Sequence, residues 1–224
     1  MNTALKQPVE GVIFDYGGVL TTPVGDSIRA WLDREGVDPS TFSRAIKEWL
    51  SRDAAPGTPI HQLELGDLGI DEFNGLLAAK LALVDGGTVA PDGLLDRLFA
   101  DVRVSVAMFD LVEELRDLGV RLALLSNSWG DDYPWDELDR LFDTVVISGR
   151  VGMRKPDPEM FAHVLGLLDL DPAQVVLVDD ADPNIAGATR AGLRAVHHLS
   201  VESTRDELSR LIPGLHPKAT KETP

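Results

Sequence analysis

Cysteine is absent from this chain of 224 residues. Its absence excludes a disulfide framework, catalysis by a thiolate, and zinc or iron–sulfur sites held by cysteine. Basic residues are scarce as well, because 21 Lys and Arg face 37 Asp and Glu and leave a formal net charge of -16. This charge repels phosphate backbones, so we expect neither nucleic acid nor an anionic membrane as a partner. It still leaves room for a local pocket that binds a small anion.

Long apolar runs are missing too. No stretch approaches the roughly 18 apolar residues that a membrane-spanning helix needs, and the opening residues MNTALKQPVE show no signal-peptide pattern. Apolar residues nevertheless make up 44% of the chain, which is enough to fill a core for the one or two domains expected at this length. We therefore expect a soluble, cytoplasmic globular protein.

Short apolar runs alternate with helical patterns from about residue 107 onward, and one further apolar run lies near the start of the chain. These runs are apolar on successive residues, as is typical of strands buried on both faces of a parallel sheet. They predict strands at residues 9–15, 121–127, 144–148, 175–180 and 193–198, and the helical patterns fall at 109–119, 158–170 and 184–192. The alternation predicts an α/β fold whose parallel strands are joined by right-handed crossovers.

Residues 22–105 differ in kind, because they read as amphipathic helices without a convincing strand. We predict that they form a helical insertion (residues 22–105) within an α/β core made of residues 1–21 and 106–212. Inside the insertion, residues 51–59 predict a loop. The tail at 213–224 has little to bury, so we expect it to be flexible.

Polar side chains collect where the predicted strands end, which is where sites form in open parallel sheets. If the strands are neighbours, the carboxylates of Asp15, Asp179 and Asp180 converge. This is unfavourable unless a cation lies among them or one is protonated, and an all-oxygen site suits Mg²⁺ with a substrate phosphate. Lys155 and the Ser126 hydroxyl would hold the other phosphate oxygens, while Asp15 attacks phosphorus in line. This chemistry predicts a small phosphorylated substrate.

Four segments carry a family resemblance. FDYGGVL (14–20), LLSNS (124–128), GMRKPDPEMF (152–161) and VDDADPNIAGATRAG (178–192) resemble, in the same order, the four motifs of the haloacid dehalogenase-like (HAD) hydrolase superfamily. The helical insertion is similar to the small cap of the subclass whose cap lies between the first two motifs, and LELGDLGIDEF (63–73) resembles a cap segment of the phosphatase branch. The resemblance implies a Rossmann-like parallel sheet with helices on both faces.

The resemblance also implies how the phosphate is bound and transferred. Asp15 would be the nucleophile that forms an aspartyl-phosphate, and Lys155 would neutralise Asp15 and the transferring group. Ser126 and Asn127 would lie at the phosphate. These roles imply a phosphatase that acts on a small metabolite.

The same resemblance implies a set of metal ligands. Asp180 would bind Mg²⁺ directly, whereas Asp179 would act through a water molecule or a hydrogen bond. Asp15 and the backbone carbonyl of Gly17 would complete the protein ligands. Asn184 would support the loop that carries the two aspartates.

One position departs from the family pattern. Gly17 stands where the first motif usually has a second Asp, which protonates the leaving oxygen and later activates water. General acid–base catalysis is worth on the order of 10²–10⁴ in rate. We therefore expect a preference for good leaving groups, such as those of sugar-1-phosphates, and the resemblance includes a branch with Gly at this position that is regarded as active.

Two other functions stay open. A 2-haloacid dehalogenase would attack carbon through Asp15 without a metal, but those enzymes usually lack paired acids such as Asp179 and Asp180. A non-catalytic protein that binds a phosphorylated ligand or a protein partner is supported only by Gly17. The oligomeric state is open, as is the role of the aromatic cluster after the second motif, which could line a pocket, form a dimer contact or pack the loop: Trp129, Tyr133 and Trp135.

Overall fold

A parallel sheet forms the centre of the computed structural model, which describes residues 8–50, 57–130 and 132–217. The strand order is β3-β2-β1-β4-β5, and every neighbouring pair is parallel. The strands are β1 (Gly11–Phe14), β2 (Arg121–Ser126), β3 (Thr144–Ile147), β4 (Val175–Asp179) and β5 (Arg194–His197). All five predicted runs are therefore strands, each with ends within two residues of the prediction.

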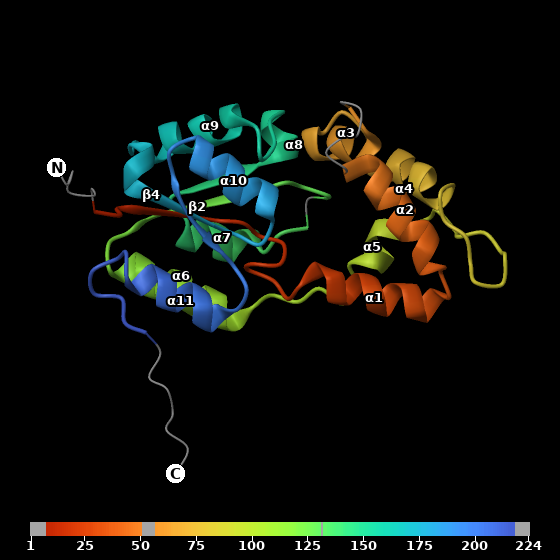
Figure 1. The fold of residues 1–224 in the computed structure, drawn as a ribbon, viewed down its shortest axis with the longest axis horizontal. Coiled ribbons are helices and arrows are strands. Elements are labelled where there is room, and N and C mark those ends of the chain that lie inside the picture. The colour runs from red at the N-terminus through yellow and green to blue at the C-terminus, as the bar shows by residue number, and fades with distance from the viewer. Residues whose placement is uncertain (1–7, 51–56, 131, 218–224) are drawn as a thin grey trace, which may run out of the picture.

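Helices cover both faces of the sheet, as predicted (Figure 1). Successive residues of a strand point to opposite faces, so Phe14 packs in one buried cluster and Ile13 in the other. On the Phe14 face lie α6 (Val106–Asp117), α7 (Trp135–Leu141) and α11 (Val201–Ser209); on the Ile13 face lie α9 (Pro158–Leu168) and α10 (Asp182–Arg190). Short helices α8 (Ser148–Val151) and η1 (Pro172–Gln174) complete the core. The Rossmann-like α/β class is thereby confirmed.

The helical insertion has a hydrophobic cluster of its own. Its helices are α1 (Val24–Glu35), α2 (Pro39–Leu50), α3 (Pro59–Leu65), α4 (Ile70–Ala78) and α5 (Leu94–Leu98). Trp31, Phe73 and Leu94 are fully buried among them. In Figure 1 these helices lie beside the sheet, and α3 contacts α8 of the core. The boundaries at 22 and 105 stay a prediction, as does most of the loop at 51–59, because residues 51–56 lie outside the described residues.

The end of the chain differs in part from the prediction. Leu215 is buried and packs in the cluster that contains Phe14 and α6, so the first residues of the predicted tail belong to the core. Leu215 stands alone between Pro213-Gly214 and His216-Pro217, so the sequence has no apolar run there that would predict its burial. Residues 218–224 lie outside the described residues. Across the described ranges, no helix is both long and apolar enough to cross a membrane.

Candidate active site

Three carboxylates meet at the carboxyl ends of the two central strands. Asp15 follows β1 directly, and Asp179 ends the neighbouring strand β4. Asp15, Asp179 and Asp180 each offer an oxygen, and these oxygens lie within 4.8 Å of one another. The predicted convergence is therefore confirmed, because β1 and β4 are adjacent in the sheet although Asp15 and Asp179 are far apart in the sequence. Their chemical roles stay predictions.

Lys155 lies between two of these carboxylates. Its side chain is completely buried, with Nζ 2.9 Å from Oδ1 of Asp15 and 2.7 Å from Oδ2 of Asp179. Burial alone lowers the pKa of Lys155, but Asp15 and Asp179 outweigh it and raise the pKa above its ordinary value. Lys155 therefore stays an ammonium group and partly neutralises the site.

Asn127 holds the backbone of Lys155 with both ends of its side-chain amide. Oδ1 of Asn127 accepts a hydrogen bond from the Lys155 amide at 2.8 Å, and Nδ2 donates to the Lys155 carbonyl at 2.9 Å. The prediction placed Asn127 at the phosphate. The structure shows its side chain paired with the backbone of the loop that carries Lys155, and its position at the phosphate stays a prediction.

The two neighbouring aspartates have different surroundings. Asp179 is buried and accepts hydrogen bonds from the amide of Ala181 at 2.9 Å and from Nδ2 of Asn184 at 3.0 and 3.1 Å. Asn184 thus lies where it was predicted to support the loop. Asp180 is the exposed member of the pair, and its carboxylate lies against Gly18, where an added Cβ would collide with it. Gly18 also has a φ of +76°, so both the close approach of Asp180 and the backbone conformation require glycine at this position.

The site carries excess negative charge at neutral pH. Burial raises the pKa of Asp15 to about 7; the nearby Lys155 opposes this shift and Asp179 adds to it. The pKa of Asp180 is also raised, by burial and then by Asp179. Three carboxylates facing one buried ammonium form an all-oxygen ligand set that fits a hard divalent cation.

The comparison with known proteins gives the family. The sequence pattern of the haloacid dehalogenase-like hydrolases matches residues 9–192. This chain belongs to the haloacid dehalogenase-like hydrolases. The match spans the first strand, the helical insertion and the loops that carry Lys155 and Asp179, so it covers the whole candidate site.

This hydrolase is similar to several curated proteins. It is 28% identical to the sesquiterpene phosphatase astK of Aspergillus oryzae, over 91% of this chain and 96% of that protein. It is also 28% identical to the validoxylamine A 7'-phosphate phosphatase of Streptomyces hygroscopicus, over 82% of this chain and 83% of that one. It spans only 19% of acyl-CoA dehydrogenase family member 10 of Mus musculus, at 27% identity over 90% of this chain.

Solved structures share the fold of this hydrolase. A predicted HAD-like family hydrolase from Porphyromonas gingivalis has a TM-score of 0.65 at 24% identity, over 92% of this chain and 98% of that chain. A HAD family enzyme from Bacteroides thetaiotaomicron, in complex with magnesium and inorganic phosphate, has a TM-score of 0.59 at 21% identity, over 84% of this chain and 93% of that chain. At these identities the likeness shows the fold.

The aromatic residues after β2 pack in two different places, one beside Tyr16 in the core and the other against the helical insertion. The Tyr133 ring packs on Tyr16 at a centroid distance of 4.7 Å and on Trp135 at 5.3 Å, and its hydroxyl lies 3.0 Å from Oγ of Ser126. Trp129 turns the other way and packs edge-on against Phe73 of the helical insertion at 5.8 Å. Tyr133 and Trp135 thus pack against each other, Trp129 packs against the helical insertion, and Tyr133 also reaches a predicted site residue.

Glu64 joins the helical insertion to the loops of the site, and the sequence analysis missed it. This buried residue of α3 accepts hydrogen bonds from Nε1 of Trp129 at 3.0 Å and from Nε of Arg154 at 2.6 Å. Arg154 directly precedes Lys155. Nearby, Gly66 approaches Gly149 so closely that an added Cβ would lie 2.7 Å from its carbonyl oxygen. A single Glu in a short amphipathic helix carries no signal of such a partner.

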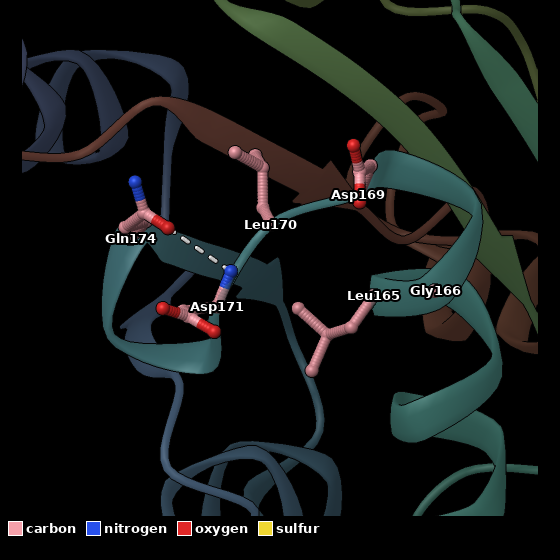
Figure 2. A pocket seen from close by; sticks show the side chains of 6 residues that line it. All are labelled: Leu165, Gly166, Asp169, Leu170, Asp171 and Gln174. Carbon is pink, nitrogen blue, oxygen red and sulfur yellow. Dashed lines mark hydrogen bonds between the residues drawn. The ribbon is translucent and has the colours of Figure 1, made fainter.

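A separate pocket lies near the amino-terminal end of β4, at the end of the strand opposite to Asp179. Figure 2 shows it just before β4, where Gln174 Oε1 accepts a hydrogen bond from the Asp171 amide at 3.0 Å. Its lining residues are Leu165, Gly166, Asp169, Leu170, Asp171 and Gln174. Because they precede β4 whereas Asp179 ends it, this pocket is separate from the candidate active site.

Proposed function

We propose that this hydrolase is a Mg²⁺-dependent phosphatase that acts on a small phosphorylated metabolite through an aspartyl-phosphate on Asp15. The observation that carries the proposal is the convergence of the three carboxylates around one buried ammonium group. The similarity to two phosphatases supports it, and so does the shared fold with an enzyme that binds magnesium and inorganic phosphate.

The metal would be held by Asp15 and Asp180, with the carbonyl of Gly17 as a further ligand. Bound Mg²⁺ supplies positive charge that offsets the carboxylates and the phosphate. Asp179 is less suited to direct binding, because Lys155, Asn184 and the Ala181 amide already use its two oxygens. It would hold Lys155 in place instead.

The side chains of this hydrolase then divide the work of phosphoryl transfer. A carboxylate oxygen of Asp15 attacks phosphorus, the bond from phosphorus to the leaving oxygen breaks, and water later hydrolyses the aspartyl-phosphate to free phosphate. Lys155 stabilises the charge on Asp15 and on the transferring group, and the hydroxyl of Ser126 donates to a phosphate oxygen. Because Gly17 cannot donate a proton, the leaving group departs as an anion.

This last step defines the proposed substrate class. A leaving group of low pKa departs without a proton, so anomeric sugar phosphates, acyl phosphates and aryl phosphates suit the site better than alkyl phosphates. The small anion is compatible with a net charge of -16, because Lys155 and a bound cation reverse the sign of the potential at one place only.

Hydrolysis of p-nitrophenyl phosphate with and without Mg²⁺ tests the proposal, with Asp15→Asn as the control. We expect metal-dependent turnover that Asp15→Asn abolishes. Chloride release from 2-haloacids without metal would overturn the proposal in favour of a dehalogenase. Absence of turnover in both assays, with binding of inorganic phosphate retained, would overturn it in favour of a binding protein.

A further inference from the structure

The hydroxyl of Tyr133 lies 3.0 Å from Oγ of Ser126, and neither the motifs nor the proposed chemistry accounts for it. Ser126 ends β2 and is only 3% exposed, so few groups can reach its hydroxyl. Tyr133 comes from the segment before α7, which is distinct from the strand. The contact therefore joins a residue proposed to bind phosphate to a side chain that has no assigned role.

The ring of Tyr133 is held on two sides. Tyr16 packs at 4.7 Å with an interplanar angle of 54°, and Trp135 packs at 5.3 Å with an angle of 58°. Tyr133, Tyr16 and Trp135 also pack against the hydrophobic cluster on the Phe14 face of the sheet. Packing of this kind fixes where the phenol oxygen lies. Because Tyr16 directly follows Asp15 in the sequence, its contact with Tyr133 also links that position to the loop that carries Asp15.

The direction of the hydrogen bond follows from the proton each hydroxyl carries. Ser126 has one proton and two acceptor lone pairs, so it can accept from Tyr133 and still donate to a second group. A phenol is the better donor of the two, because its oxygen lone pairs are shared with the ring. Burial raises the pKa of Tyr133, which keeps the phenol protonated at neutral pH.

We propose that Tyr133 is a positioning residue that donates its hydroxyl proton to Ser126 and thereby directs the Ser126 proton to a non-bridging phosphate oxygen of the substrate. The inference rests on the proposed phosphatase function. No covalent bond forms or breaks in this step, and both protons stay on their oxygens. Hydrogen bonds in a chain polarise one another, so the donation from Tyr133 also strengthens the bond from Ser126 to the phosphate.

A double-mutant cycle with Tyr133→Phe and Ser126→Ala tests the proposal. Phenylalanine keeps the ring between Tyr16 and Trp135 and removes only the hydroxyl. We expect Tyr133→Phe to lower kcat/KM for p-nitrophenyl phosphate about tenfold, and to have almost no further effect in the Ser126→Ala background. The loss should be equal for an alkyl phosphate, because the leaving oxygen is not involved.

Other outcomes overturn the inference. It fails if Tyr133→Phe leaves kcat/KM unchanged, or lowers it by the same factor with and without the Ser126 hydroxyl. A loss confined to alkyl phosphates also overturns it, because Tyr133 would then act on the leaving group. Inhibition by inorganic phosphate gives a second readout, since Tyr133→Phe should weaken it severalfold, whereas a purely structural role lowers the melting temperature and leaves the inhibition constant unchanged.

The proposed function can fail separately. If the unaltered hydrolase shows no turnover that depends on Asp15, the phosphatase proposal fails before Tyr133 is tested. If that turnover is present and the cycle shows no coupling between Tyr133 and Ser126, the phosphatase stands and this inference is wrong.

Discussion

Nζ of Lys155 lies 2.7 Å from Oδ2 of Asp179, and neither side chain is exposed to solvent. The same ammonium group lies 2.9 Å from Oδ1 of Asp15. A buried charge is costly unless it is paired and hydrogen-bonded. Lys155 therefore has two linked tasks, since it compensates the buried Asp179 and the partly buried Asp15 in the folded protein and supplies positive charge at the candidate site.

Replacing Lys155 with Met should destabilise the protein strongly. The change leaves Asp15 and Asp179 facing each other without their shared cation, and breaking a buried pair costs about 3–5 kcal/mol of the free energy of unfolding. Urea denaturation at pH 8 measures this loss. Lys80→Met is the matched control, because Lys80 pairs with Glu48 on the surface and should change stability by at most about 1 kcal/mol. Equal losses in the two variants would contradict the prediction.

The stability of the metal-free protein should fall as the pH rises from about 4 to about 7. The pKa of Asp15 is 3.8 in its ordinary state and is raised to about 7 in the fold, mainly by burial. Between these values the folded chain holds a proton that the unfolded chain has released, so the free energy of unfolding decreases with pH. The raised pKa of Lys155 lies above this window and does not contribute to the change.

Asp15→Asn isolates this effect, because asparagine does not titrate. Urea denaturation in the presence of a chelator, at pH 5, 6, 7 and 8, should show a smaller loss of stability for Asp15→Asn than for the unaltered protein. Parallel pH profiles for the two proteins would show that Asp15 does not titrate in this range.

Replacing Gly17 with Asp should raise the activity toward alkyl phosphates at least tenfold, because it restores a proton donor for a poor leaving group. The substitution has room: the nearest atom to an added Cβ, among the described residues, is Cγ2 of Val24 at 3.6 Å. Activity toward p-nitrophenyl phosphate should change much less. Gly17→Asn is the control of equal size without a transferable proton, and an equal gain in that variant would contradict the reasoning.

Replacing Glu64 with Ala should weaken the attachment of the helical insertion to the site loops. Arg154 and Trp129 both lose their buried acceptor, so we expect the free energy of unfolding to fall by about 3 kcal/mol. Glu48→Ala, which breaks the exposed pair with Lys80, is the control and should cost at most about 1 kcal/mol. Chemical denaturation compares the two variants, and a loss for Glu64→Ala no larger than that of the control would contradict the prediction.

Local sequence patterns were sufficient for the sheet and for the ends of its central strands. Runs such as 175–180 are apolar on successive residues because both faces of a central parallel strand are buried, and this pattern needs no knowledge of the partner strand. Asp15 and Asp179 could be placed together for the same reason, since parallel strands present their carboxyl ends at one edge. Lys155 was placed with them from its position just before a predicted helix, and its motif supports that placement.

The same local patterns did not predict which side chains contact each other. The side chain of Asn127 pairs with the backbone of Lys155, and Glu64 pairs with Arg154 across 90 residues of sequence; neither contact was predicted. Leu215 was assigned to a flexible tail, yet it is buried. Each of these contacts depends on which elements are neighbours and on rotamers set by packing, neither of which is written in the local spacing of residue types.

By itself, the sequence determined the α/β class, the order of the motifs and the acidic residues that gather at one edge of the sheet, because strand burial and strand direction act through local pattern. Only the tertiary structure decided how those residues are used. It buried Lys155 between Asp15 and Asp179, and it brought the Tyr133 hydroxyl to Ser126. The physical reason is that charge compensation and hydrogen-bond direction depend on distances of a few ångströms between residues that are far apart in the chain.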